Sequence, residues 1–203
     1  MPLLDHFQSA LSDAWPWDGI HANWATKIAD QLNADCLPRD YHAISFIKRG
    51  QEISEEDLFE VQVIRRPGGA RLRAAVELVS PSNKDRPGSR RAFVIKCASY
   101  MRQGVSVAIV DVVTERLANL HADLLRLLEV SGDLPWQSPT NLYAVAYRVA
   151  GANGVRSLEI WSESLALGRA LPTLPLWLEA DVSMPLRLEE SYQAACKSLR
   201  IPL

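Results

Sequence analysis

The chain has 203 residues, with 22 Lys or Arg against 24 Asp or Glu, so its formal net charge is −2. This near-balance excludes a protein held to nucleic acid by bulk positive charge, although it leaves room for a local basic patch. A hydrophobic fraction of 48% and a charged fraction of 23% exclude intrinsic disorder and collagen-like structure. The length predicts a single domain over residues 1–203.

The sequence also predicts the cellular compartment of the protein. It has no run of about 18 apolar residues, so no transmembrane helix is expected. The start, MPLLDHFQSALSDAWPWDG, has acids where a secretory signal needs a basic start and an apolar run. Cys36, Cys97 and Cys196 lack close spacing, which is typical of reduced thiols. We therefore expect a cytoplasmic protein that makes no membrane contact.

The first part of the chain predicts one helix and a hairpin. Residues 21–33 place an apolar side chain every four positions, which predicts a helix. Residues 41–48 alternate and predict a strand, and the acidic stretch 51–57 predicts a loop. Two β-rich runs, 58–65 and 71–80, are joined by a Pro-Gly-Gly turn and predict a β-hairpin.

The middle of the chain predicts a βαβ unit. Ser89 is a good N-cap for a helix over residues 90–103, which Gly104 closes. Residues 105–113 are almost entirely apolar, which indicates a central strand covered on both faces. Strand, helix and strand at this spacing predict that the two strands lie parallel.

The last part predicts a helix over 119–130, strands over 142–149 and 155–161, a proline-broken extended segment over 171–178, and a closing helix over 188–199. The predicted fold class is therefore α/β. A mixed sheet has flanking helices, and a second hairpin and a helix stand at the C-terminal end.

Glu77 is the most informative residue. Strand alternation places Val76 and Leu78 on one face, with Ala75 and Val79 beside Glu77 on the other. Apolar neighbours on both faces predict that Glu77 is buried. A buried carboxylate without a partner is costly, so Glu77 must form an ion pair, bind a metal or change its protonation.

The hairpin predicts a neighbour for Glu77. A turn centred between Gly68 and Gly69 brings Glu60 directly opposite Glu77. Like charges that face each other destabilise a strand pair, so an Arg, a Lys or a divalent cation is expected between them. Two carboxylates that hold Mg²⁺ would suit the hydrolysis of a phosphodiester.

Arg90 and Arg91 are the candidate cations. Positive charge at a helix N-terminus opposes the helix dipole, which indicates a role in pairing with Glu77 or in contacting a phosphate. Adjacent helical residues point about 100° apart. Arg90 stands one turn before Val94 and Cys97, on the side of the helix that should meet the sheet. We therefore expect Arg90 to face Glu77, and Arg91 to meet a phosphate or a surface acid. A purely structural salt bridge is the alternative.

The segment AVELVSPSNKDRPGSRRAF, with the helix that follows and VSVAIVDVV, resembles an uncharacterised bacterial family, the domain-of-unknown-function family four-zero-five-eight. The resemblance continues through HANWATKIADQLN, NLHADLLRLL, LPTLPLWL and LEESYQAAC. That family is similar to a distant branch of the PD-(D/E)XK restriction-endonuclease-like superfamily, where a Glu-x-x-Ser-Pro strand end precedes a helix that supplies a basic residue. The resemblance implies a restriction-endonuclease-like core with Glu77 as a metal ligand. It also implies that Arg90 or Arg91 replaces the usual lysine, because Val79 occupies the third position of Glu-x-Lys.

The chain departs from the superfamily pattern in one respect. The preceding strand of that pattern carries an acid, usually Asp after Pro, whereas this region offers Asp57 in a polar loop and Glu60 on a strand. This departure is typical of a partly degraded or repurposed site. The expected function is a nuclease-like activity on DNA or RNA, with Mg²⁺ held by Glu60 and Glu77. The alternatives are a non-catalytic module of the same fold that binds nucleic acid or protein, and a purely structural homo-oligomer.

Overall fold

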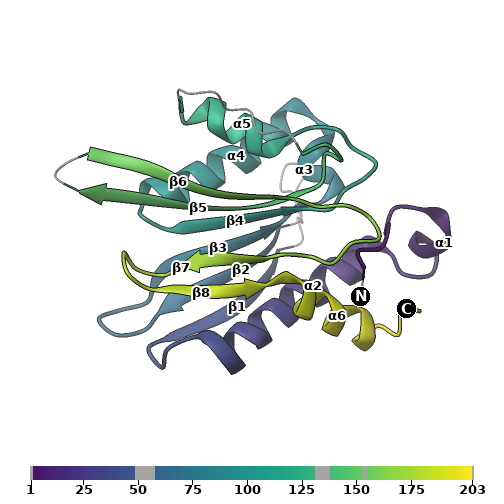
Figure 1. Ribbon diagram of the computed structural model, residues 1–203, viewed down its shortest axis with the longest axis horizontal. Coiled ribbons are helices and arrows are strands. Elements are labelled where there is room, and N and C mark those ends of the chain that lie inside the picture. Colours follow the sequence, from purple (N-terminus) through teal and green to yellow (C-terminus); the bar gives the residue numbers. More distant parts are fainter. Residues whose placement is uncertain (1, 49–57, 131–137, 153–154, 203) are drawn as a thin grey trace.

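The computed structural model describes residues 2–48, 58–130, 138–152 and 155–202. Asp57 and the loop predicted over 51–57 lie outside the described residues. Six strands form a mixed sheet in chain order, in which β3 and β4 are parallel and all other neighbours are antiparallel (Figure 1). The strands are β1 (Tyr41–Lys48), β2 (Leu58–Arg65), β3 (Arg71–Leu78), β4 (Ser106–Asp111), β5 (Tyr143–Ala152) and β6 (Val155–Ser164).

Helices cover both faces of this sheet. On one face, α4 and α5 pack over the strands around a core that includes Phe93 and Leu124. On the other face, α2, α6 and a two-stranded sheet of β7 and β8 enclose a core around Trp24 and Tyr192 (Figure 1). The remaining elements are α1 (Ser9–Ser12), α2 (Trp17–Gln31), the π-helix η1 (Leu32–Cys36), α3 (Pro81–Asp85), α4 (Pro87–Arg102), α5 (Leu120–Leu127), β7 (Thr173–Trp177), β8 (Ser183–Arg187) and α6 (Leu188–Ser198).

The β2–β3 hairpin has the predicted pairing at its far end. Glu60 lies directly opposite Glu77, although Arg65 lies opposite Arg71 near the turn, one residue out of that register. A bulge between Val63 and Ile64 absorbs the difference. Glycines with φ of 75° and 98° form the turn, at Gly68 and Gly69, a left-handed conformation that glycine adopts without strain.

The predicted βαβ unit is confirmed, with one addition. Between β3 and α4 stands α3, a single turn that the sequence interpretation did not anticipate. Its capping box accounts for it: the Ser80 backbone N–H donates to Asn83 Oδ1 at 2.9 Å, and Pro81 occupies the first turn. Helix α4 then begins at Pro87, before the expected N-cap Ser89.

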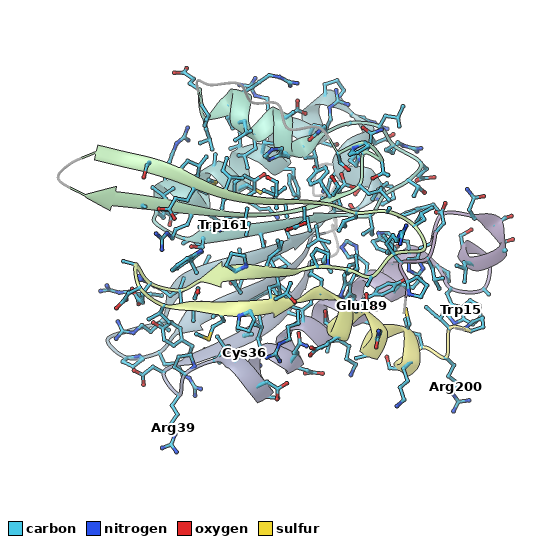
Figure 2. All side chains as sticks on the ribbon, viewed as in Figure 1. Trp15, Cys36, Arg39, Trp161, Glu189 and Arg200 are labelled. Carbon is cyan, nitrogen blue, oxygen red and sulfur yellow. The ribbon has the colours of Figure 1, made fainter. Side chains whose placement is uncertain are left out.

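The C-terminal part differs from expectation mainly in β8, which pairs with β7 and was not predicted. The segment 171–178 contains β7, so its prolines do not prevent pairing in a two-stranded ribbon. Trp161 of β6, which is labelled in Figure 2, has its ring centroid 5.7 Å from that of Trp177 of β7, and this contact ties the small sheet to the large one.

The coarse fold class is confirmed as a mixed α/β structure, with a six-stranded mixed sheet and flanking helices. Within the described ranges, every helix is too short or too polar to cross a membrane.

Candidate functional site

The candidate site is built on the pair of carboxylates that face each other across β2 and β3. Both residues are buried, with exposed fractions of 4% for Glu60 and 1% for Glu77. The predicted burial of Glu77 is therefore confirmed. Val76 and Leu78 point to the α2 face of the sheet, whereas Glu77 points to the α4 face.

Lys96 of α4 is the cation that lies between the two acids. Its Nζ donates to Glu77 Oε2 at 2.7 Å and to Glu60 Oε2 at 3.3 Å. The Lys96 side chain keeps 19% of its surface exposed, so it connects the buried acids to solvent. The expectation of a positive group between Glu60 and Glu77 is confirmed, but the residue that supplies it is not the predicted one.

Two further side chains hold Glu60. The Tyr100 hydroxyl donates to both carboxylate oxygens, at 3.1 and 3.3 Å, and Gln62 donates its amide N–H to Oε1. Tyr100 stands one helical turn after Lys96, so both side chains leave α4 on the flank beside its buried stripe. The site thus contains two acids, one ammonium group, one phenol and one amide.

Burial and charge separate the pKa values of the two acids. Burial, and then the charge of Glu60, raise the pKa of Glu77 to about 8 against the lowering effect of Lys96. Burial alone would also raise the pKa of Glu60, but Lys96 and the hydrogen bonds of the site hold it below its ordinary value. The two carboxylates raise the pKa of Lys96 despite its burial. At neutral pH, Glu60 is therefore ionised, Lys96 is charged and Glu77 is largely protonated.

Arg90 and Arg91 are not part of this cluster, and the expectation that Arg90 faces Glu77 is wrong. The Arg90 guanidinium lies 3.8 Å from Asp123 of α5 and donates to the Lys84 carbonyl at 3.4 Å. Arg91 is exposed. Because α4 begins three residues before Arg90, its first turn stands beside α5, away from the acids.

A second buried acid and lysine lie at the end of β4. Lys84 Nζ donates to Asp111 Oδ2 at 2.9 Å and to the Val113 carbonyl at 3.4 Å, and both charged side chains are fully buried. The Val113 N–H donates to Asp111 Oδ1 at 3.1 Å. Burial raises the pKa of Asp111 to about 6, against the lowering effect of Lys84.

The sequence interpretation missed Lys96, Tyr100, Lys84 and Asp111. Lys96 and Tyr100 carry a usable signal, because they stand four residues apart beside the apolar stripe of a predicted helix. Asp111 carries a stronger one, as the only acid in the apolar run 105–113. A lone acid in such a strand requires a cationic partner for the reason already given for Glu77.

The donor set of the site fits a hard divalent cation that keeps most of its waters. Mg²⁺ is commonly bound by one or two carboxylates together with water and substrate phosphate oxygens. Glu60 and Glu77 supply two such groups, and the buried Oε1 of Glu77 has no hydrogen-bond partner among the described residues. No group of three or more metal-ligating side chains occurs in the described part of the chain. Any cation bound here therefore depends on water or on substrate for its remaining ligands.

Comparisons of the chain with family models, with curated proteins and with solved structures find no match. The interpretation of the site therefore depends on its own geometry.

Proposed function

We propose that the chain is a nuclease-like phosphodiester hydrolase that uses Mg²⁺ or Mn²⁺ at Glu60 and Glu77, with Lys96 as its cationic residue, on a restriction-endonuclease-like core. The observation that carries the proposal is the contact of Lys96 Nζ with both carboxylates, at 2.7 and 3.3 Å. The order of these residues along the chain also supports it. An acid on one strand, an acid near the end of the next and a basic residue on the following helix match the superfamily pattern, with Lys96 in the place assigned to Arg90 or Arg91.

Each side chain then has a distinct task. Glu60 is ionised and anchored by Tyr100 and Gln62, so it is the fixed ligand of the cation. Glu77 releases its proton when it becomes the second ligand. Lys96 stays charged, so it acts as a donor to a phosphate oxygen and not as a general base. A bound divalent cation supplies the positive charge that stabilises the charge developing on the phosphate.

The alternative is a non-catalytic module of the same fold that binds nucleic acid or protein. The same ammonium group supports it, because Lys96 already pairs with both acids without any added cation. In this alternative, the cluster is structural: Lys96 forms an ion pair with Glu60 and a hydrogen bond with the protonated Glu77.

Thermal unfolding with and without metal separates the two functions. A ligand at about 100 times its Kd stabilises the folded state by about 2.7 kcal/mol, which corresponds to a rise in Tm of about 5–10 °C at this chain length. We expect that rise for the wild-type chain with Mn²⁺ or Mg²⁺, together with cleavage of a labelled oligonucleotide. Glu60→Gln and Glu77→Gln should each abolish both effects.

Glu163→Gln is the matched control, because Glu163 is an exposed acid on β6 with the same change of charge. This variant should keep the full rise in Tm. No shift of the wild-type Tm at millimolar metal, together with no binding heat by calorimetry, would reject the hydrolase. A shift without cleavage would show metal binding without hydrolysis and would also reject the hydrolase.

A further inference from the structure

Two exposed apolar side chains lie beside the acid cluster. On the edge strand β1, Tyr41 and Ala43 point into the core on the α2 side, so the alternating residues Ile44 and Phe46 point to the α4 side. There Ile44 is 38% exposed and Phe46 is 44% exposed. Single exposed apolar side chains are common, but Ile44 and Phe46 are neighbours on one face of β1 next to a polar site, which is typical of a contact surface.

The strand register connects these side chains to the site. Phe46 is the direct cross-strand neighbour of Glu60, and Ile44 is the neighbour of Gln62. Facing residues on adjacent strands have Cβ atoms about 5 Å apart and share one face of the sheet. Phe46, Glu60 and Glu77 therefore form one row across β1, β2 and β3, which begins with an exposed ring and ends under Lys96.

The backbone of β1 is not free to pair with another strand at Ala43. Asn33 of η1 bonds both free backbone groups of Ala43. Its Nδ2 donates to the carbonyl, and its Oδ1 accepts from the N–H, each at 2.8 Å. An edge closed in this way is protected against pairing with a second chain. The contact surface is thus the exposed side chain of Phe46 and not the backbone of β1.

We propose that Phe46, with Ile44 beside it, stacks on an unpaired base of a single-stranded nucleic acid whose adjacent phosphate lies at Glu60, Glu77 and Lys96. This inference rests on the proposed hydrolase function and names its substrate class. In a nucleotide, one sugar separates the base from its phosphate. This separation matches the short distance between Phe46 and Glu60, which face each other on adjacent strands. Within a duplex the bases are stacked on each other and hidden from such a ring, whereas any unpaired base presents a π-face to an aromatic side chain.

The charge of the chain supports stacking as the source of affinity. The net charge is −2, and the site itself carries two carboxyl groups for one ammonium group. Binding driven by phosphate neutralisation falls steeply with salt, because it depends on the release of counterions. Stacking on Phe46 should depend only weakly on salt.

The test measures fluorescence anisotropy of labelled oligothymidylate and oligouridylate, alone and annealed to their complements, with the full chain. Single strands of both kinds should bind, and the duplexes should bind at least tenfold more weakly. Phe46→Ala should weaken single-strand binding by about tenfold, the scale of one base stack on an aromatic ring. Phe46→Trp should retain it, and Leu167→Ala should leave it unchanged, because Leu167 is equally exposed at 44%.

The outcomes separate this inference from the proposed function. A wild-type rise in Tm with metal that persists in Phe46→Ala, together with lost oligonucleotide binding, supports both. The same rise with unchanged binding, or equal binding of duplex and single strand, overturns the base-stacking inference and leaves the hydrolase standing. Binding that depends on Phe46 without any metal effect keeps the stacking site but overturns the hydrolase. Binding that high salt abolishes and that Phe46→Ala does not change also overturns stacking, in favour of phosphate contacts.

Discussion

The two buried clusters of acids and lysine contain the same chemical groups in different proportions. The Lys84–Asp111 pair matches one ammonium with one carboxylate, and both side chains are 0% exposed. The site cluster places two carboxyl groups against one ammonium, and Lys96 reaches solvent. The first cluster is neutral when both partners are charged, whereas the second is neutral only when one acid holds a proton.

This difference separates a structural pair from a site. The Lys84–Asp111 pair also satisfies the Val113 carbonyl and N–H, so it closes the end of β4 without needing any further partner. The site cluster retains an acid with a pKa of about 8, which can exchange its proton for a cation. The ratio of acids to bases and the route to solvent distinguish the clusters better than burial does.

The largest expected effect on stability comes from breaking the balanced Lys84–Asp111 pair. Lys84→Met leaves Asp111 buried without its cation and should lower the free energy of unfolding by about 3–5 kcal/mol. Lys96→Met should cost only about 1–2 kcal/mol, because Glu77 is already largely protonated and Glu60 keeps its hydrogen bonds to Tyr100 and Gln62. Urea denaturation at pH 7 measures both values.

Lys27→Met is the control for this pair of variants. Lys27 lies 3.4 Å from Asp30 on the exposed side of α2, and the loss of such a surface pair should cost less than about 0.5 kcal/mol. Equal costs for Lys84→Met and Lys96→Met would contradict the distinction between the two clusters.

A smaller effect should come from the excess acid of the site. The pKa of Glu77 rises from 4.5 to about 8 on folding, so the folded chain binds the proton more tightly than the unfolded chain. The stability due to this group is complete below pH 4.5 and is lost as the pH rises toward 8. Glu77→Gln has no such proton to lose, so its stability relative to wild type should increase over the same range.

Urea midpoints at pH 5 and pH 8.5, without metal, test this sign. We expect Glu77→Gln to gain about 3–4 kcal/mol over wild type between the two pH values, since each unit of pKa shift is worth about 1.4 kcal/mol and most of the shift from 4.5 to about 8 lies within this range. Glu163→Gln should show no comparable gain. A relative stability that stays the same at the two pH values would show that Glu77 is ionised throughout this range and would contradict its raised pKa.

The sequence was sufficient to predict the β2–β3 hairpin and the pairing of Glu60 with Glu77. Turn glycines and strand alternation are local, and the bulge shifted the register only near the turn. It was also sufficient to predict a cation between the acids, because that follows from electrostatics alone.

The identity of the cation could not be predicted with the same reasoning. Whether Arg90 or Lys96 meets Glu77 depends on where α4 begins and on which of its turns crosses β3. With the capping box of α3 before it and a proline in its first turn, α4 begins at Pro87, earlier in the chain than predicted. Arg90 then pairs with Asp123 of α5 and not with Glu77. Helix boundaries are the least reliable part of a prediction from sequence, and here the site depended on one.

The smallest expected effect concerns Arg90, which belongs to neither cluster. Its guanidinium lies 3.8 Å from Asp123, and both side chains are about one-third exposed, so water and salt screen the pair. Arg90→Ala should therefore lower the free energy of unfolding by no more than about 1 kcal/mol, and it should leave the metal-induced rise in Tm at its wild-type size. Arg91→Ala provides the comparison, because Arg91 is exposed and should change stability even less. If Arg90→Ala instead removed the response to metal while Lys96→Met kept it, the basic residue of the site would be Arg90 after all.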